Sequence, residues 1–366
     1  MFYLLEILFV IVFIIQVYYY LYFFSRFSFS NKPLKKEVNL PISIIICAKN
    51  EAQNLTDFLP SIIQQKYSDF EIVLVNDHST DDTLKVMQYF AEIHKHITIV
   101  NLTDKNSTGN KKNAVTQGIN ASKKEYLLFT DADCKPKTNY WISEMAAHFT
   151  NKKQIVLGYG AHQKTKNSWL NKLIRFETLL TALQYFSYAK VNLAYMGVGR
   201  NLAYTKSVFK KANGFESHKH LKSGDDDLFV NQIASHNVSC CYTPNSFTIS
   251  KPHTNFKKWI YQKRRHISTA SSYKTTHQIL LGLFYVSQFL FWTLSVFLLI
   301  TSPNKQIIIS LFIFRTAFLY FIYGFSAKKL KETDLILYLP FLELFLILIQ
   351  MRIFIQNLFS KPKNWS

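Results

Sequence analysis

Four long apolar segments constrain this chain more than any other feature of its sequence. They lie at its two ends, contain at most one charged residue each, and are Phe2 to Phe24, Ile279 to Thr301, Gln306 to Phe325 and Leu335 to Met351. A helix that crosses a bilayer needs about 20 mainly apolar residues. The first three segments meet that length, and the fourth meets it if it extends to about Leu358. The sequence therefore predicts an integral membrane protein whose transmembrane helices flank a polar region.

Basic residues beside these segments predict their orientation. We interpret the first segment as a retained anchor, because it is too long for a signal peptide and has neither a basic start nor a small-residue cleavage site. Basic residues that follow the first and third segments are Arg26, Lys32, Lys35, Lys36, Lys328, Lys329 and Lys331. Because such residues favour the cytoplasmic side, four spans would place the polar region in the cytoplasm, at the cell (inner) membrane, and both termini outside. Lys361 and Lys363 weigh mildly against an outside C-terminus.

The net charge of +20 identifies membrane lipids as expected partners. Basic residues near an anionic leaflet each contribute about 1 kcal/mol of attraction. Nucleic acid also attracts basic proteins, but the basic residues are scattered and no nucleic-acid module is recognisable, so we expect no nucleic-acid partner. The four cysteines have no zinc-binding spacing, and a cytoplasmic domain predicts free thiols.

The polar region alternates between strand and helix patterns. Expected strands cover 42–48, 71–75, 97–101, 126–129 and 154–158, and expected helices include 54–65, 109–121 and 169–190. This alternation predicts a doubly wound α/β domain with a largely parallel sheet. The predicted organisation is an anchor at 1–25, a linker at 26–39, the α/β domain at 40–277, three transmembrane helices within 278–358 (about 278–301, 306–326 and 334–357) and a tail at 359–366. The helix at 169–190 either packs in the core or lies in the membrane interface, and we favour the interface.

Carboxylates follow the apolar strands of this domain. Asp131 and Asp133 come directly after the strand at 126–129, and residues i and i+2 of an extended chain point to the same side. Glu51 and Asp77 follow two other strands. Ligands of open α/β sheets bind at these strand ends, and paired carboxylates suit Mg²⁺ or Mn²⁺ on a diphosphate. The alternative is a polar loop that happens to contain two aspartates. The sequence contains neither G-x-G-x-x-G after the first strand nor a P-loop, which argues against a dinucleotide oxidoreductase and a P-loop ATPase.

Four motifs together resemble the family 2 glycosyltransferases in order and spacing. They are Pro41 to Glu51, Val75 to Asp81, Lys111 to Ala114, and Thr130 to Asp133. The resemblance implies a GT-A (Rossmann-like) doubly wound mixed sheet that binds a nucleotide-diphospho-sugar. It also implies Mn²⁺ or Mg²⁺ at Asp133 and Asp131, and nucleotide contacts at Ala48, Glu51, Asp77, Lys111 and Asp131. Asn76 stands where the family often has an aspartate, so we assign the base contact to Asp77.

Two later elements extend the resemblance. Gly197 to Tyr204 is similar to the family's acceptor-side strand and implies acceptor contacts near Gly199 and Asn201; the alternative is an ordinary turn. Asp225, Asp226 and Asp227 are similar to the E-D-x-D-L element, although Gly224 replaces the glutamate. The resemblance implies that Asp225 is the general base, with Asp226 as second choice. The alternative is a solvated acidic helix start.

The segment from Gln262 to His266 resembles the Q-x-x-R-W element of the family. Gln262 and Arg265 share a helix face and are expected to hold the acceptor and the departing diphosphate. His266 replaces the tryptophan on the acceptor side, which leaves acceptor type and processivity open. The alternative is a basic helix at the membrane interface. One face of the helix can serve catalysis while another contacts lipid. His253 either completes the metal site or is a surface histidine.

Two isolated charges lie in the third and fourth apolar segments. Arg315 and Glu343 are expected to pair between helices, because intramembrane charges usually find a partner. Snorkelling or a shorter span is the alternative.

These features together predict a membrane-bound, metal-dependent, inverting glycosyltransferase. Its donor would be a nucleotide-diphospho-sugar, with a UDP-sugar as the first candidate, and its acceptor a lipid-linked molecule or a glycan. The close alternative is a processive polysaccharide synthase, although three spans after the catalytic domain make only a modest channel. More distant alternatives are a nucleotidyltransferase and a non-enzymatic membrane scaffold.

Overall fold

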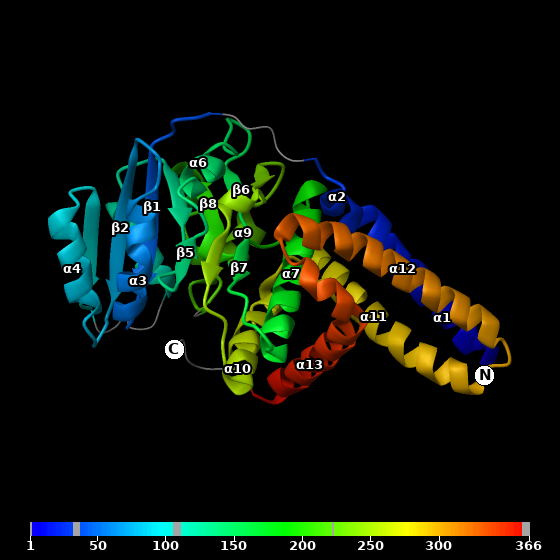
Figure 1. Cartoon of the computed structure of the whole chain (residues 1–366). Helices are drawn as coiled ribbons and strands as arrows, with labels where there is room; N and C mark the ends of the chain where they lie inside the picture. Colours follow the sequence, from blue (N-terminus) through cyan, green and yellow to red (C-terminus); the bar gives the residue numbers. More distant parts are fainter. Residues whose placement is uncertain (1, 32–36, 105–110, 222, 361–366) are drawn as a thin grey trace.

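The computed structural model describes residues 2–31, 37–104, 111–221 and 223–360. Parts of the predicted linker and tail, the first residues of the expected helix at 109–121, and several of the basic residues used for orientation lie outside these ranges. Figure 1 shows an α/β domain on one side and a bundle of long helices on the other.

The central sheet has seven strands in the order β3-β2-β1-β4-β8-β6-β9. The first four in the chain are parallel, and they are β1 (Ile42–Ala48), β2 (Phe70–Asp77), β3 (Ile97–Leu102) and β4 (Tyr126–Phe129). β8 (Leu202–Thr205) is antiparallel to both β4 and β6 (Ile155–Leu157), and β9 (Val238–Cys240) is parallel to β6. The sheet is therefore mixed and doubly wound, which confirms the predicted fold class. A small second sheet pairs β10 (Thr248–Ser250) with β5 (Cys134–Pro136) and β7 (Gly160–His162).

Alternate residues of the central strands pack into two different cores. In β1, Ile44 and Ile46 face one core, which contains α3 (Ala52–Ile63), α4 (Thr83–Ile93) and α6 (Trp141–Ala146). Ile45 faces the other core, which contains α5 (Lys111–Ala121), α7 (Trp169–Lys190), α9 (Asp227–Ile233) and parts of the long helices. This alternation follows from the two-residue period of a strand. α7 is mostly buried between the sheet and the helical bundle, so it packs in the core and the preference for the membrane interface was wrong.

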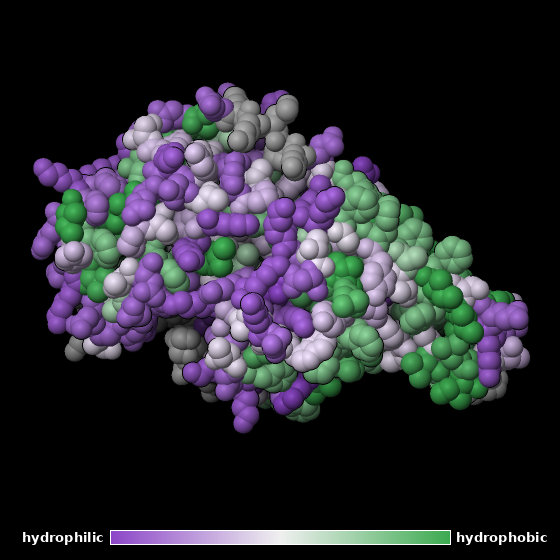
Figure 2. All heavy atoms as spheres, viewed as in Figure 1, coloured by the Kyte–Doolittle hydropathy of each residue, from purple (hydrophilic) through white to green (hydrophobic). Residues whose placement is uncertain are grey.

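Among the residues that the structure describes, four helices are long and apolar enough to cross a membrane. The first is continuous through α1 (Phe2–Tyr18), a π-helical turn (Tyr19–Phe24) and α2 (Ser25–Ser28), and the others are α11 (Thr275–Thr301), α12 (Lys305–Leu330) and α13 (Leu339–Phe359). Figure 2 shows apolar residues over the bundle and hydrophilic residues over the α/β domain. The shorter helices α8 (Lys206–Lys211) and α10 (Phe256–Ile267) belong to the α/β domain.

α13 begins and ends beside the α/β domain. Just before its start, Asp334 accepts a hydrogen bond from Arg175 of α7 at 2.6 Å. At its end, the Asn357 side-chain oxygen accepts a hydrogen bond from Arg264 of α10 at 2.9 Å. α1, α11 and α12 extend away from the domain together, whereas α13 returns toward α10 (Figure 1). A straight fourth span would instead end at the far side of the bundle.

The expected pairing of Arg315 with Glu343 is confirmed. Both nitrogens at the end of the Arg315 guanidinium donate to the Glu343 carboxylate, at 2.6 and 2.5 Å, and both side chains are buried. Gln16 of α1 accepts from Arg315, and Gln288 of α11 donates to Glu343, each at 2.9 Å. The pair therefore joins all four long helices through one polar cluster.

Candidate active site

Loops at the carboxyl ends of β1 and β2 are tied together by hydrogen bonds. Asn50 has a positive φ of 57°, which turns the chain sharply after β1. Its side-chain oxygen accepts from the backbone N–H of Thr80 at 2.8 Å, and the N–H of Glu51 donates to the Thr83 hydroxyl at 2.8 Å. Glu51 is thereby held near Asp131 and Asp133. Burial, together with those negative charges, raises the pKa of Glu51.

Asp77 lies at the end of β2 and is almost completely buried. Its Oδ1 is hydrogen-bonded to the His78 ring at 2.8 Å. Its Oδ2 is buried and has no hydrogen-bond partner among the residues that the structure describes. Since a buried acceptor oxygen is normally hydrogen-bonded, Asp77 can accept a hydrogen bond from a ligand N–H. Ala48, at the end of β1, is buried beside β2.

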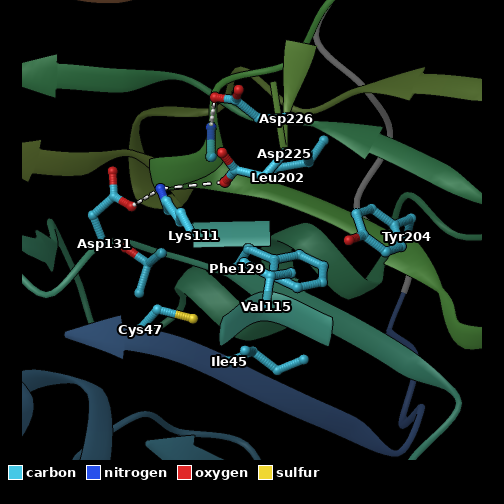
Figure 3. A pocket seen from close by; sticks show the side chains of 12 residues that line it. Ile45, Cys47, Lys111, Val115, Phe129, Asp131, Leu202, Tyr204, Asp225 and Asp226 are labelled. Carbon is cyan, nitrogen blue, oxygen red and sulfur yellow. Dashed lines mark hydrogen bonds and ion pairs between the residues drawn. The ribbon is translucent and has the colours of Figure 1, made fainter. Parts of the chain in front are cut away.

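Lys111 links the carboxylates of two distant segments. Its ammonium nitrogen lies 2.8 Å from Asp131 and 3.3 Å from Asp225, and Figure 3 shows it between them. Burial alone would lower the pKa of Lys111, but the surrounding aspartates outweigh burial and raise that pKa well above its ordinary value. The lysine is therefore a permanent cation at the centre of the acidic group. A cavity of about 20 Å³ beside it has room for about one water molecule.

Asp131 and Asp133 lie in a turn after β4 rather than in extended chain. Ligand atoms of Asp131, Asp133 and Cys134 lie within 4.8 Å of one another. Burial and the charge of Asp131 raise the pKa of Asp133, whereas Lys111 outweighs burial at Asp131 and lowers its pKa. Two carboxylates that disfavour each other's ionisation fit a divalent cation. The cysteine thiol instead donates a weak hydrogen bond to Asp133 at 3.3 Å.

The three adjacent aspartates have different surroundings. Asp225 lines the cavity beside Lys111. Asp226 is the N-cap residue that precedes α9, and its carboxylate accepts hydrogen bonds from the backbone N–H groups of Gly199 at 2.7 Å and of Asp227 at 2.8 Å. Burial and the two neighbouring aspartates raise the pKa of Asp226 to about 7. Asp227 points elsewhere and accepts hydroxyl hydrogen bonds from Thr269 and Tyr273, at 2.5 and 2.7 Å.

The acceptor-side residues are placed differently from one another. Gly199 lines the cavity, and a Cβ there would lie 3.2 Å from Asp226 Oδ2, a tight contact. Asn201 is fully buried, and its amide bonds Trp141, Tyr159 and Ser246. Because these hydrogen bonds use both the oxygen and the nitrogen of the Asn201 amide, the side chain is not available to a ligand. Its position indicates a structural role.

α10 brings further polar groups toward the acids. Burial lowers the pKa of Arg265, and the charges of Asp225 and Asp131 oppose that shift, so Arg265 faces the acidic group. Gln262 lies beside His253. The pKa of His253 is lowered by burial, while Gln262 and the charge of Asp133 oppose that shift, which places His253 near Asp133. His266 is exposed on the same helix.

Arg200 is a cation of this site that the sequence reasoning missed. Its guanidinium bonds His162 at 3.0 Å and Ser250 at 3.1 Å, and its charge acts to lower the pKa of both Asp131 and Asp133. Lys111, Arg200 and Arg265 thus surround the acids. The only sequence signal for Arg200 was its place directly after Gly199.

Comparisons with known proteins agree with this geometry. Residues 43–212 match the family model described as Glycosyl transferase family 2. An "Uncharacterized glycosyltransferase" of Haemophilus influenzae is 25% identical over 198 residues, which cover 50% of this chain and 55% of that protein. The poly-beta-1,6-N-acetyl-D-glucosamine synthase of Staphylococcus aureus is 28% identical over 122 residues, 32% of this chain and 28% of the synthase. The chain thus spans about half the length of the first relative and about a quarter of the length of the second.

A solved structure extends the similarity to the whole fold. The mannosyltransferase PcManGT from Pyrobaculum calidifontis, in complex with GDP-Man and Mn²⁺, superposes with a TM-score of 0.60 at 15% identity, covering 94% of this chain and 99% of that one. Residues 43–212 therefore form a Glycosyl transferase family 2 domain, and the chain has the GT-A fold.

Proposed function

We propose that this protein is a membrane-bound inverting glycosyltransferase that uses a nucleotide-diphospho-sugar, with a UDP-sugar as the first candidate and a GDP-sugar as the second. The observation that carries the proposal is the bridge from Lys111 to both Asp131 and Asp225. Asp131, which we assign to the donor side, and Asp225, which we assign as the base, thus lie beside one cation, in a domain that matches a glycosyltransferase family.

The nucleotide would lie over the ends of β1 and β2. Asp77 offers a buried acceptor oxygen to an N–H of the nucleotide base. Ala48 lies at the end of β1 and Glu51 shortly after it, and both would contact the same nucleotide. Asp133 and Asp131 would hold Mn²⁺ or Mg²⁺, with His253 as a further candidate ligand. When bound, the ion would neutralise charge on the diphosphate. Lys111, Arg200 and Arg265 supply positive charge from the protein for the leaving diphosphate.

Asp225 is the proposed general base. It lies beside Lys111 in the cavity, and its carboxylate would take the proton of the acceptor hydroxyl that attacks the anomeric carbon. The C–O bond to the diphosphate breaks as the new glycosidic bond forms, so a single displacement inverts the anomeric centre. Asp226 is a weaker candidate, because backbone N–H groups already occupy both of its oxygens.

The acceptor would be a lipid-linked molecule or a growing glycan that approaches the face of α10 on which Gln262 and Arg265 lie. Gln262, His266 and Gly199 are the residues assigned to that side. A processive polysaccharide synthase is the second candidate, because a poly-beta-1,6-N-acetyl-D-glucosamine synthase is among the relatives.

The decisive experiment measures nucleotide diphosphate release by membranes that contain the full chain. A panel of UDP- and GDP-sugars is supplied with Mn²⁺, with Mg²⁺, or with a chelator. Metal-dependent release from one donor, lost in Asp133→Ala and Asp225→Asn, is expected. A protein that neither binds nor turns over any of these donors would overturn the proposal, and product length separates single transfer from processive synthesis.

A further inference from the structure

A groove of about 320 Å³ lies between α10 and α13. Aromatic and basic side chains line it, among them Phe256, Tyr261, Lys257, Arg264 and Arg352. On α10, residues 257, 261 and 264 follow the spacing of one helix face, whereas Gln262 and Arg265 lie on the face assigned to catalysis. The groove is therefore separate from the proposed sugar-transfer site.

Arg264 fixes the end of α13 against α10. Its guanidinium donates to the Asn357 side chain and to the Ser360 hydroxyl, each at 2.9 Å, and to the Ser360 carbonyl. The Asn357 amide donates back to the Arg264 carbonyl at 3.0 Å. An arginine at the C-terminal end of a helix satisfies carbonyls that lack a helical partner. The shape of the groove thus depends on contacts within the protein and does not require a ligand.

Two other cations of the groove are available to a ligand. Lys257 and Arg352 are exposed, and the described part of the chain provides neither side chain with a hydrogen bond or an ion pair. The residues lining the groove include no acid. The groove thus carries positive charge that is not balanced locally, which suits an anion.

The rim of the groove is apolar. On α13, Ile355 and Phe359 lie three and seven residues after Arg352, on the same helix face, and have 46% and 87% of their surface exposed. Apolar side chains of that size are stable when lipid covers them. Because α13 ends at the α/β domain, this rim lies at the level where the bundle meets the domain (Figure 1). Cations beside an apolar rim fit a ligand that has both a phosphate and acyl chains.

We propose that the groove between α10 and α13 binds an anionic phospholipid, with its phosphate at Lys257 and Arg352 and its acyl chains along Ile355 and Phe359. A soluble phosphate compound would use only the cations and leave the apolar rim uncovered. The binding does not depend on the proposed sugar transfer and is measured without turnover.

The test is native mass spectrometry of the full chain in detergent, titrated with phosphatidylglycerol or with phosphatidylcholine. The groove variant is Lys257→Gln/Arg352→Gln. Because two basic residues at a membrane surface together contribute about 2 kcal/mol, we expect the groove variant to bind phosphatidylglycerol about thirty-fold more weakly. Phosphatidylcholine, with no net charge, should bind weakly to both proteins.

Two further variants control for charge and folding. Lys210→Gln/Lys211→Gln removes the same charge from exposed positions of α8 and should bind as the wild type does. Lys257→Arg/Arg352→Lys keeps the charge and should retain binding. Equal phosphatidylglycerol binding by the wild type and the groove variant would overturn the proposal. Displacement of the lipid by an equal concentration of glycerol 3-phosphate would overturn it too, in favour of a soluble anion.

Discussion

The ammonium nitrogen of Lys111 lies 3.3 Å from a carboxylate oxygen of Asp225. The same nitrogen lies 2.8 Å from Asp131, so one cation sets the spacing between the proposed base and the proposed metal-binding turn. Lys111→Gln removes this charge and leaves the acids to repel each other. We expect turnover to fall by about 10²-fold or more, as for other lost electrostatic groups. The measurement is initial-rate kinetics, with exposed Lys85→Gln as the control; a two-fold effect would contradict this role.

Asp225 and Asp226 are adjacent but should respond differently to removal of their charge. Asp225→Asn is expected to lower kcat by about 10² to 10⁴-fold, the usual contribution of a general base, and to leave nucleotide binding nearly unchanged. Asp226→Asn keeps the shape of the helix start and should retain more activity. Single-turnover kinetics and calorimetric nucleotide binding on both variants provide the comparison. Full activity in Asp225→Asn with loss in Asp226→Asn would move the base to Asp226.

The raised pKa of Asp226 predicts a pH-dependent stability. A carboxyl whose pKa is higher in the folded chain than in the unfolded chain favours folding while it is protonated. The contribution of Asp226 is thus fully present below about pH 4 and is lost as the pH rises through about 7. Asp226→Asn stays neutral, so its Tm relative to the wild type should rise between pH 5 and pH 8. Thermal unfolding in detergent measures this difference, and parallel pH profiles would contradict it.

The Arg315–Glu343 pair predicts strong coupling inside the helical bundle. Arg315→Gln or Glu343→Gln leaves one buried charge without its partner, which costs about 3 to 5 kcal/mol in other proteins. The double variant removes both charges and should lose much less than the sum of the two single losses. A double-mutant cycle on unfolding in detergent measures the coupling. Additive losses would mean that Gln16, Gln288 and other polar neighbours hold each charge independently.

Much of the fold could be predicted from sequence because local patterns encode it. The apolar runs at Ile42–Ala48 and Tyr126–Phe129 have the length and the β-branched or aromatic residues of buried strands. The apolar character of α7 was ambiguous, because a helix buried against both a sheet and a membrane bundle has no clean polar face. The path of α13 was not predictable, since its turn back depends on Arg175 and Arg264, which are distant in the sequence.

The residues of the candidate site could be predicted where a sequence motif contains them. Asp131 and Asp133 could be singled out because they directly follow the strand β4, and Asp225 because it begins a run of three aspartates. Arg200 was missed, since a single arginine beside a glycine has no pattern of its own. Asn201, in contrast, was assigned to the acceptor from its place in a motif, but three long-range hydrogen bonds occupy its side chain.

The path of α13 predicts on which side of the membrane this helix ends. Because α13 ends on α10, residue 359 should be on the same side of the membrane as the α/β domain, opposite the turn between α11 and α12. Lys305→Cys and Phe359→Cys place single exposed thiols at these two points, and Lys210→Cys marks the α/β domain. The native cysteines are free and mostly buried, so they should react slowly. In intact cells, a membrane-impermeant thiol reagent should label Lys305→Cys alone, and after lysis it should label all three. Labelling of both Lys305→Cys and Phe359→Cys in intact cells would instead mean that α13 crosses the bilayer as a fourth span.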